Sequence, residues 1–149
     1  MYSGLRFAVR AILVSESKLL LVNAYKPEDQ KNLWCAPGGG IDAHSSLHEN
    51  LKREVFEETG YTIEVGKVAM VNEFHDPKVP FHQVEIFFRS QIVGSPVKTP
   101  WEDPAGVVME SRFFCEKECS LISLKPSKLL EVAFDNHSEV AYDPLELMI

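Results

Sequence analysis

The stretch that decides the fold runs from Gly39 to Tyr61 and reads GGIDAHSSLHENLKREVFEETGY. Its middle carries one apolar residue every four positions, the spacing of an amphipathic helix: Leu47, Leu51 and Val55. Ser46 and Glu49 form the S-x-x-E pattern of a capping box, and Gly60 stands where a helix commonly ends in a left-handed residue. The pattern predicts a helix over Ser46 to Thr59.

The last turn of this predicted helix concentrates negative charge. Glu54, Glu57 and Glu58 are spaced i, i+3 and i+4, so their side chains share one face. The helix dipole disfavours each anion at this end by about 0.3–1 kcal/mol, and like charges at this spacing repel one another. A hard divalent cation would remove the conflict, because it prefers clustered carboxylate oxygens. Taken alone, such a triad is more often the solvated acidic face of a helix.

A glycine-rich segment, Pro37-Gly38-Gly39-Gly40, comes just before the helix. Glycine lets the backbone approach a ligand closely and adopt dihedral angles that other residues avoid. Beside an acidic helix, such a segment can add a carbonyl ligand and leave room for a phosphate group. For the glycines alone, an ordinary turn is the alternative.

Taken together, these residues resemble the Nudix box. The family pattern is a Gly, five residues, a Glu, seven residues, Arg-Glu, an aliphatic residue, any residue, Glu-Glu, any residue, a Gly and a hydrophobic residue. The positions that match in register are Gly39, Arg53, Glu54, Val55, Glu57, Glu58, Gly60 and, more loosely, Tyr61. One position departs: the first Glu of the pattern falls on Ser45, which carries no charge, and Asp42 is a candidate to replace it in part.

The resemblance implies a hydrolase with Mg²⁺ or Mn²⁺ as its cofactor. Glu54, Glu57 and Glu58 would bind one to three ions, and the carbonyl of Gly39 would be a further ligand. Arg53 would orient a carboxylate through a charge-assisted hydrogen bond. Water made acidic by the metal would attack phosphorus in a phosphoanhydride bond of a nucleoside diphosphate derivative.

The general base has two main candidates. Within the box we expect Glu57. Outside it we favour Glu110, because Glu110-Ser111-Arg112-Phe113-Phe114 resembles the family's late Glu followed by an aromatic residue, at the end of a strand. Glu102 and Asp103 are weaker candidates. An acid outside the box is more often an ordinary surface residue.

The rest of the chain predicts a layered α/β domain that spans residues 1–149. The predicted strands and final helix are Leu5–Val14 and Lys18–Ala24 as a hairpin, Ile63–Phe74, Gln83–Val93 and Val107–Phe114 as strands, and Pro126–Phe134 as the helix. His75–Phe81 is predicted as a loop, and Asn136–Ile149 has no assignment. The family resemblance narrows this fold to an α/β/α sandwich with a mixed β-sheet and the box as loop-helix-loop.

Composition limits the partners. The net charge is −7 and no run of Lys and Arg occurs, which argues against long nucleic acids. No stretch reaches the roughly 20 apolar residues of a membrane span, and the start lacks the pattern of a signal peptide. Three cysteines without a CxxC pair indicate reduced thiols. We therefore expect a cytoplasmic monomer or homodimer that acts on a small-molecule nucleoside diphosphate derivative, with no membrane partner.

Two questions stay open at the level of sequence. The substrate could be ADP-ribose, an oxidised or ordinary nucleoside triphosphate, a dinucleoside polyphosphate or a nucleotide sugar. A different class of function, a Nudix-fold sensor that binds a nucleotide without cleaving it, finds support only in Ser45. Phe81 and Trp101 are candidates to stack a nucleobase, although aromatic residues more often fill cores.

Overall fold

The computed structural model describes residues 4–23, 25, 32–95, 101–108, 110–135 and 139–147, with side chains described as far as residue 144. The elements, in chain order, are β1 (Arg6–Ser15), β2 (Lys18–Asn23), β3 (Trp34–Cys35), β4 (Gly38–Gly40), α1 (Leu47–Thr59), β5 (Thr62–Asp76), β6 (Phe81–Val93), β7 (Glu110–Cys115), α2 (Glu116–Cys119), α3 (Lys128–Phe134) and β8 (Ala141–Leu147).

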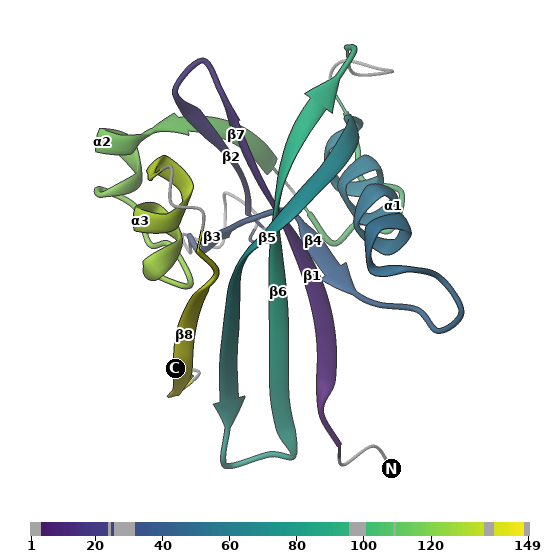
Figure 1. The fold of residues 1–149 in the computed structure, drawn as a ribbon, viewed down its shortest axis with the longest axis vertical. Coiled ribbons are helices and arrows are strands. Elements are labelled where there is room, and N and C mark those ends of the chain that lie inside the picture. Colours follow the sequence, from purple (N-terminus) through teal and green to yellow (C-terminus); the bar gives the residue numbers. More distant parts are fainter. Residues whose placement is uncertain are drawn as a thin grey trace.

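One mixed sheet forms the centre of the molecule (Figure 1). Its strand order is β3-β2-β1-β6-β5-β8, with β4 pairing β1 and β7 pairing β2. The pairs β1–β6 and β5–β8 are parallel, and the other pairs are antiparallel. Helix α1 lies on one side of the sheet, and α2 and α3 lie on the other (Figure 1). The predicted α/β/α sandwich with a mixed sheet is confirmed.

The side chains of β1 alternate between the two faces of the sheet, so this strand contributes to a hydrophobic core on each face. Val9, Ala11 and Leu13 join the core under α1, which also contains Leu51 and Val55 from the apolar strip of that helix. Ile12, on the opposite face, joins the core under α3. The helix that carries the box is thus fixed against the central strand.

Several predicted boundaries change in the structure. The predicted loop His75–Phe81 shortens to a turn over residues 77–80, because β5 and β6 stay paired as far as Asp76 and Phe81. Strand β7 begins at Glu110 rather than Val107, because the Asp103 carboxylate accepts hydrogen bonds from the backbone N–H groups of Val107 and Val108.

Other elements were absent from the prediction. The short strands β3 and β4 and the helix α2 have no signal of their own in the sequence, and β8 occupies part of the unassigned end. The predicted end of the first hairpin, Ala24, lies outside the described residues.

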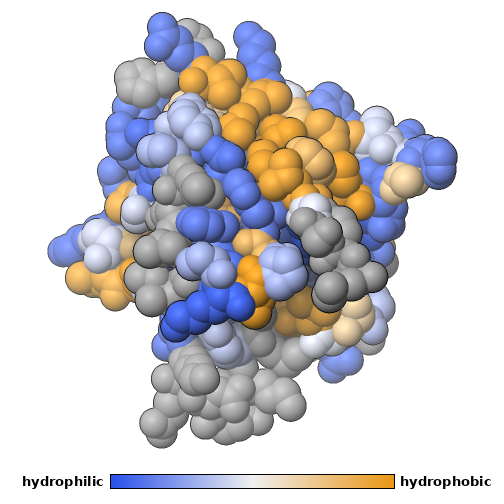
Figure 2. All heavy atoms as spheres, turned by 90° about the horizontal axis from the view of Figure 1, so that it is seen from below, coloured by the Kyte–Doolittle hydropathy of each residue, from blue (hydrophilic) through white to orange (hydrophobic). Residues whose placement is uncertain are grey.

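The sheet extends beyond the helices at its lower end (Figure 1). Seen from that end, apolar side chains gather on part of the surface (Figure 2). Among the described residues with exposed apolar side chains, Phe7 lies on β1 and Tyr142 on β8. No helix in the described part of the chain is both long enough and apolar enough to cross a bilayer.

Candidate active site

Helix α1 is capped at both ends by the predicted residues, Ser46 and Gly60. The hydroxyl of Ser46 accepts a hydrogen bond from the backbone N–H of Glu49 at 3.0 Å. At the other end, Gly60 has φ 77° and its N–H donates to the carbonyl of Phe56 at 2.8 Å. The left-handed conformation favours glycine at this position. These caps fix the turn that carries the acidic residues.

Trp101 packs against the same helix end. Its indole N–H donates to the carbonyl of Glu57 at 2.9 Å, and a Cβ on Gly60 would lie 2.7 Å from its ring. Its ring also makes an edge contact with Phe56, at 5.2 Å between centroids. Trp101 therefore satisfies a carbonyl that the helix leaves without an internal partner. Its predicted alternative use, stacking on a nucleobase, has no support in these contacts.

The glycine segment lies directly against the acidic face of α1. The N–H of Gly38 donates to Oε1 of Glu58 at 2.8 Å. A Cβ on Gly39 would lie 2.6 Å from Oε2 of Glu54, so a larger residue would push the carboxylate away. The glycine segment thus contacts two of the predicted metal ligands, Glu54 through Gly39 and Glu58 through Gly38, and Glu57 lies on the same turn of the helix.

Arg53 connects the carboxylates of the box. Its guanidinium lies 3.0 Å from Glu54 and 3.4 Å from Glu57. It also reaches Asp42 at 3.1 Å and the side-chain oxygen of Asn50 at 3.1 Å. These contacts suit the predicted orienting role of Arg53, and they place the carboxylate of Asp42 beside its guanidinium.

Asn50 is a residue of the site that sequence reasoning missed. It is buried, with 1% of its surface exposed. Its amide nitrogen donates to the carbonyls of Asp42, Ser45 and Ser46, and its oxygen accepts from the N–H of Asp42. This one side chain ties the loop before the helix to Arg53. A polar residue at a position facing the core was the available signal.

Burial raises the pKa values of two carboxylates. Burial raises the pKa of Glu58 to about 7, although the Gly38 N–H and Arg10 favour its ionised form and oppose this shift. Glu54 and Asp103 add to the rise through their negative charge. Burial also raises the pKa of Glu54, against the opposing effect of Arg53. Below about pH 7 the metal-free protein therefore favours protonated Glu58, and a cation would reverse that preference.

The acids outside the box lie in different settings. Glu110 is the first residue of β7, paired with Asn23, rather than at the end of a strand as predicted. Its carboxylate lies 3.6 Å from Arg112, and within the described residues no hydrogen bond or ion pair joins it to α1. Asp103, one of the two weaker candidates, adds to the rise in the pKa of Glu58 through its charge, and its carboxylate accepts from the N–H of Ala105 at 2.9 Å.

The donor set fits a hard divalent cation in its chemistry. Carboxylate and carbonyl oxygens are the ligands that Mg²⁺ and Mn²⁺ prefer, and the absence of a side chain at Gly39 leaves the space that Glu54 occupies. The carboxylates do not converge on one point: within the described residues, no three His, Cys, Asp or Glu side chains are arranged to hold an ion. Arg53 and the Gly38 N–H bind these oxygens instead.

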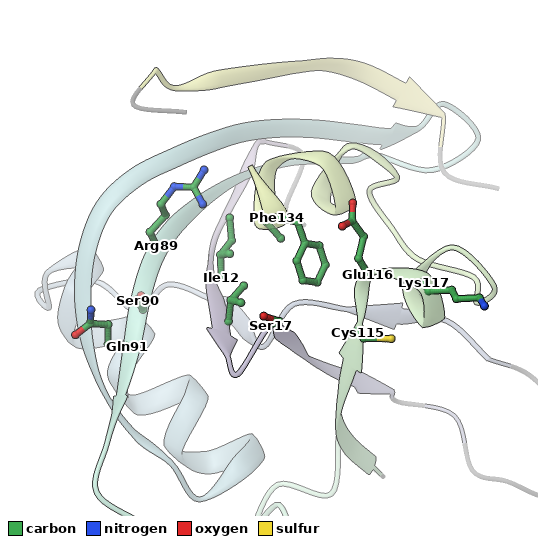
Figure 3. Close-up of a pocket in the computed structure, with 11 residues that line it drawn as sticks. Ile12, Ser17, Arg89, Ser90, Gln91, Cys115, Glu116, Lys117 and Phe134 are labelled. Carbon is green, nitrogen blue, oxygen red and sulfur yellow. The ribbon is translucent and has the colours of Figure 1, made fainter. Parts of the chain in front are cut away.

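A cavity of about 940 Å³ lies elsewhere, between the β1–β2 hairpin, β6, the β7–α2 junction and α3 (Figure 3). Its lining includes Arg89, Lys117 and Phe134, and it contains none of the predicted site residues. An open space without convergent functional groups is weak evidence for a site. The chemistry of the box, rather than this cavity, therefore defines the candidate site.

We expect Asp42 to substitute in part for the carboxylate that the family pattern places at position 45. Asp42→Ala removes the contact with Arg53 and should weaken metal-dependent activity more than Ser45→Ala. Ser45→Glu should raise activity or tighten metal binding. Activity and Mn²⁺ affinity of the three variants test this. If all three variants match the parent, position 45 simply tolerates the change.

Glu58 should make the metal-free protein less stable as the pH rises. The folded state holds a proton that the unfolded state has released between the ordinary pKa of 4.5 and about 7. The free energy of unfolding should therefore fall across this window, by about 1–3 kcal/mol. Glu58→Gln imitates the protonated acid and should remove this part of the dependence. Denaturant unfolding at pH 5 and pH 8, with Glu49→Gln as the control, measures it; equal pH dependence in parent and Glu58→Gln contradicts the shift.

The sequence of this chain is similar to those of known proteins. A family model described as NUDIX domain matches residues 4–135. The "Putative ADP-ribose pyrophosphatase YjhB" of Bacillus subtilis (strain 168) is 34% identical over 82 residues, which cover 53% of this chain and 38% of that protein. An ADP-ribose pyrophosphatase of Methanocaldococcus jannaschii is 29% identical over 91 residues, which cover 61% of this chain and 53% of that protein. The matches thus span about half or less of these relatives.

Among solved structures, the chain is similar to a crystal structure of an ADP-ribose pyrophosphatase from Streptococcus suis 89-1591. The TM-score is 0.64 at 25% identity, and the match covers 93% of this chain and 98% of the other. The likeness therefore extends over nearly all of both chains.

Proposed function

Because this chain belongs to the Nudix family, we propose that it hydrolyses a phosphoanhydride bond in a nucleoside diphosphate derivative with the help of Mg²⁺ or Mn²⁺. The observation that carries the proposal is the contact between the glycine segment and the acidic turn of α1. Gly38 binds Glu58, and Gly39 leaves the space that Glu54 fills. A helix face that served only as a solvated surface would not need this contact.

The residues that would hold the metal are Glu54, Glu57, Glu58 and the carbonyl of Gly39. The metal would supply positive charge against phosphate oxygens and lower the pKa of bound water. Arg53, which already contacts Glu54 and Glu57, would keep these carboxylates oriented.

Glu57 is our first choice for the general base. Its side chain is more exposed than that of Glu54, at 37% against 18%, so it can reach a water molecule from the surface. Glu110 remains the choice outside the box, and it would need to approach from β7. A base must come within hydrogen-bonding reach of the water that it deprotonates, although this reach is often completed only when substrate binds.

The relatives' names make ADP-ribose the first substrate to test. We further propose that the protein acts in the cytoplasm, as a monomer or homodimer, on small molecules rather than long nucleic acids. Its three cysteines are free in the structure, which agrees with a reducing compartment.

A substrate panel tests the proposed function. Purified protein is incubated with Mg²⁺ or Mn²⁺ and with ADP-ribose, a nucleotide sugar, a dinucleoside polyphosphate, and ordinary and oxidised nucleoside triphosphates. Phosphate-containing products are then separated and identified. Cleavage of at least one compound supports the hydrolase. Tight nucleotide binding without any product would instead support the sensor.

A further inference from the structure

Arg10 lies at the centre of the sheet, where a charged side chain is unusual. On strand β1 it pairs with Phe87 of the parallel strand β6 and with Gly38 of the antiparallel strand β4. Only 16% of its side chain is exposed, and only 5% of that of Glu85, its ion-pair partner. Arg10 therefore lies where the central strand β1 meets the glycine segment that precedes the box.

The two arms of the Arg10 guanidinium hold different parts of the protein. Its Nε lies 2.7 Å from Oε2 of Glu85, and the same oxygen accepts from the amide of Gln83 at 3.0 Å. Its Nη1 donates to the carbonyl of Ala36 at 3.1 Å and to that of Gly38 at 3.4 Å. Glu85, itself held by Gln83, thus orients Arg10 toward the glycine segment.

Gly38 connects Arg10 to Glu58 in the box. Its carbonyl accepts from Arg10, and its N–H donates to Glu58 on α1. Its φ of 153° and the 1.9 Å that would separate a Cβ from the carbonyl oxygen of Val9 exclude a side chain that could hold it in place. Glycine is free to take other conformations, so the position of this peptide depends on its external hydrogen bonds.

Stability alone is a poor account of this arrangement. A buried ion pair often contributes little net stability, and apolar residues of similar volume can replace it at no loss. A pair that also binds the backbone beside a metal site does something an apolar pair cannot. Arg10 binds the carbonyls of Ala36 and Gly38, which precede the predicted metal ligand Gly39 in the chain.

We propose that Arg10, held by Glu85, is a positioning residue that fixes the Gly38–Gly40 segment against Glu54 and Glu58 and thereby sets the affinity of the metal site. This inference rests on the proposed function only in its assignment of the metal ligands. Groups that orient metal ligands commonly change metal affinity or activity 10–100-fold when they are removed.

The test measures Mn²⁺ binding directly, by calorimetry without substrate, and then the Mn²⁺ concentration that gives half-maximal turnover. Arg10→Lys keeps the positive charge but cannot span Glu85 and two carbonyls in one plane. We expect its Mn²⁺ dissociation constant and its half-maximal Mn²⁺ concentration to rise by roughly tenfold or more. Turnover at saturating Mn²⁺ should stay near that of the parent.

Arg89→Lys is the matched control. Arg89 lies on the same sheet and also donates to two backbone carbonyls, those of Val132 and Asp135 at 2.9 and 3.0 Å, on the side of α3. Its replacement should lower the melting temperature and leave Mn²⁺ affinity unchanged. If Arg10→Lys does not fold, the double variant Arg10→Met/Glu85→Leu removes the pair without leaving either buried charge alone, and the same loss of affinity is expected.

The outcomes separate the two proposals. Parent-like Mn²⁺ affinity in the folded Arg10 variant overturns the positioning role, even if the parent is an active hydrolase. Loss of Mn²⁺ affinity in that variant supports the role, even if the parent cleaves no compound in the panel. A parent that binds no Mn²⁺ overturns the positioning role together with the metal-dependent function.

Discussion

Glu57→Gln is expected to lower turnover by at least two orders of magnitude and to leave the fold intact. The change keeps the size of the side chain but removes its charge and basicity. A general base alone typically contributes about 10²–10⁴-fold, and the loss of a metal ligand would add to that. The structure predicts little change in stability, because Glu57 is 37% exposed and lies 3.4 Å from Arg53. Exposed pairs of this kind contribute about 0–1 kcal/mol.

Steady-state turnover and metal-free melting must therefore be measured together. Glu49→Gln, in the first turn of the same helix, is the control for removal of one negative charge. It should keep parent-like turnover. A nearly inactive Glu57→Gln with an unchanged melting temperature supports the catalytic assignment. If this variant melts several degrees below the parent without metal, Glu57 is structural and the assignment fails.

Removal of divalent metal is expected to abolish hydrolysis, and added Mg²⁺ or Mn²⁺ should restore it. Without a cation, burial raises the pKa values of Glu54 and Glu58, and the ionised carboxylates repel one another. The site then lacks the divalent cation that would neutralise charge developing on a phosphate. Turnover is measured in excess chelator, with Ca²⁺ as a control for a divalent ion of different size. Undiminished turnover in chelator would exclude the proposed mechanism.

Metal should also stabilise the fold, because it binds the folded state and not the unfolded chain. At a concentration 100 times the dissociation constant, the expected gain is about 2.7 kcal/mol. Below pH 7 metal binding must displace the proton from Glu58, so the apparent affinity should fall as the pH falls. Calorimetric titrations at pH 6 and pH 8 measure this difference.

The sequence by itself determined the helix of the box. The apolar strip, the Ser46 cap and the Gly60 terminus are relations between residues a few positions apart. Helix α1 ends at the predicted Thr59 and begins at Leu47, directly after its N-cap Ser46. The first hairpin and the long strands β5 and β6 were also predictable, because each has enough residues for its own pattern. The spacing of Arg53 and the glutamates identified the family for the same reason, since it depends on chain order alone.

Only the tertiary structure decided the elements and contacts that join distant parts of the chain. Strands β3 and β4 have two and three residues, and they are strands only because β2 and β1 offer them hydrogen-bonding partners. Strand β8 pairs with β5, with Ala141 opposite Met70. No local sequence pattern specifies such a distant partner. Arg10 and Glu85 are 75 positions apart. Periodicity and caps record interactions within one element, whereas the surroundings of Gly38 and Glu58 arise only when several elements pack together.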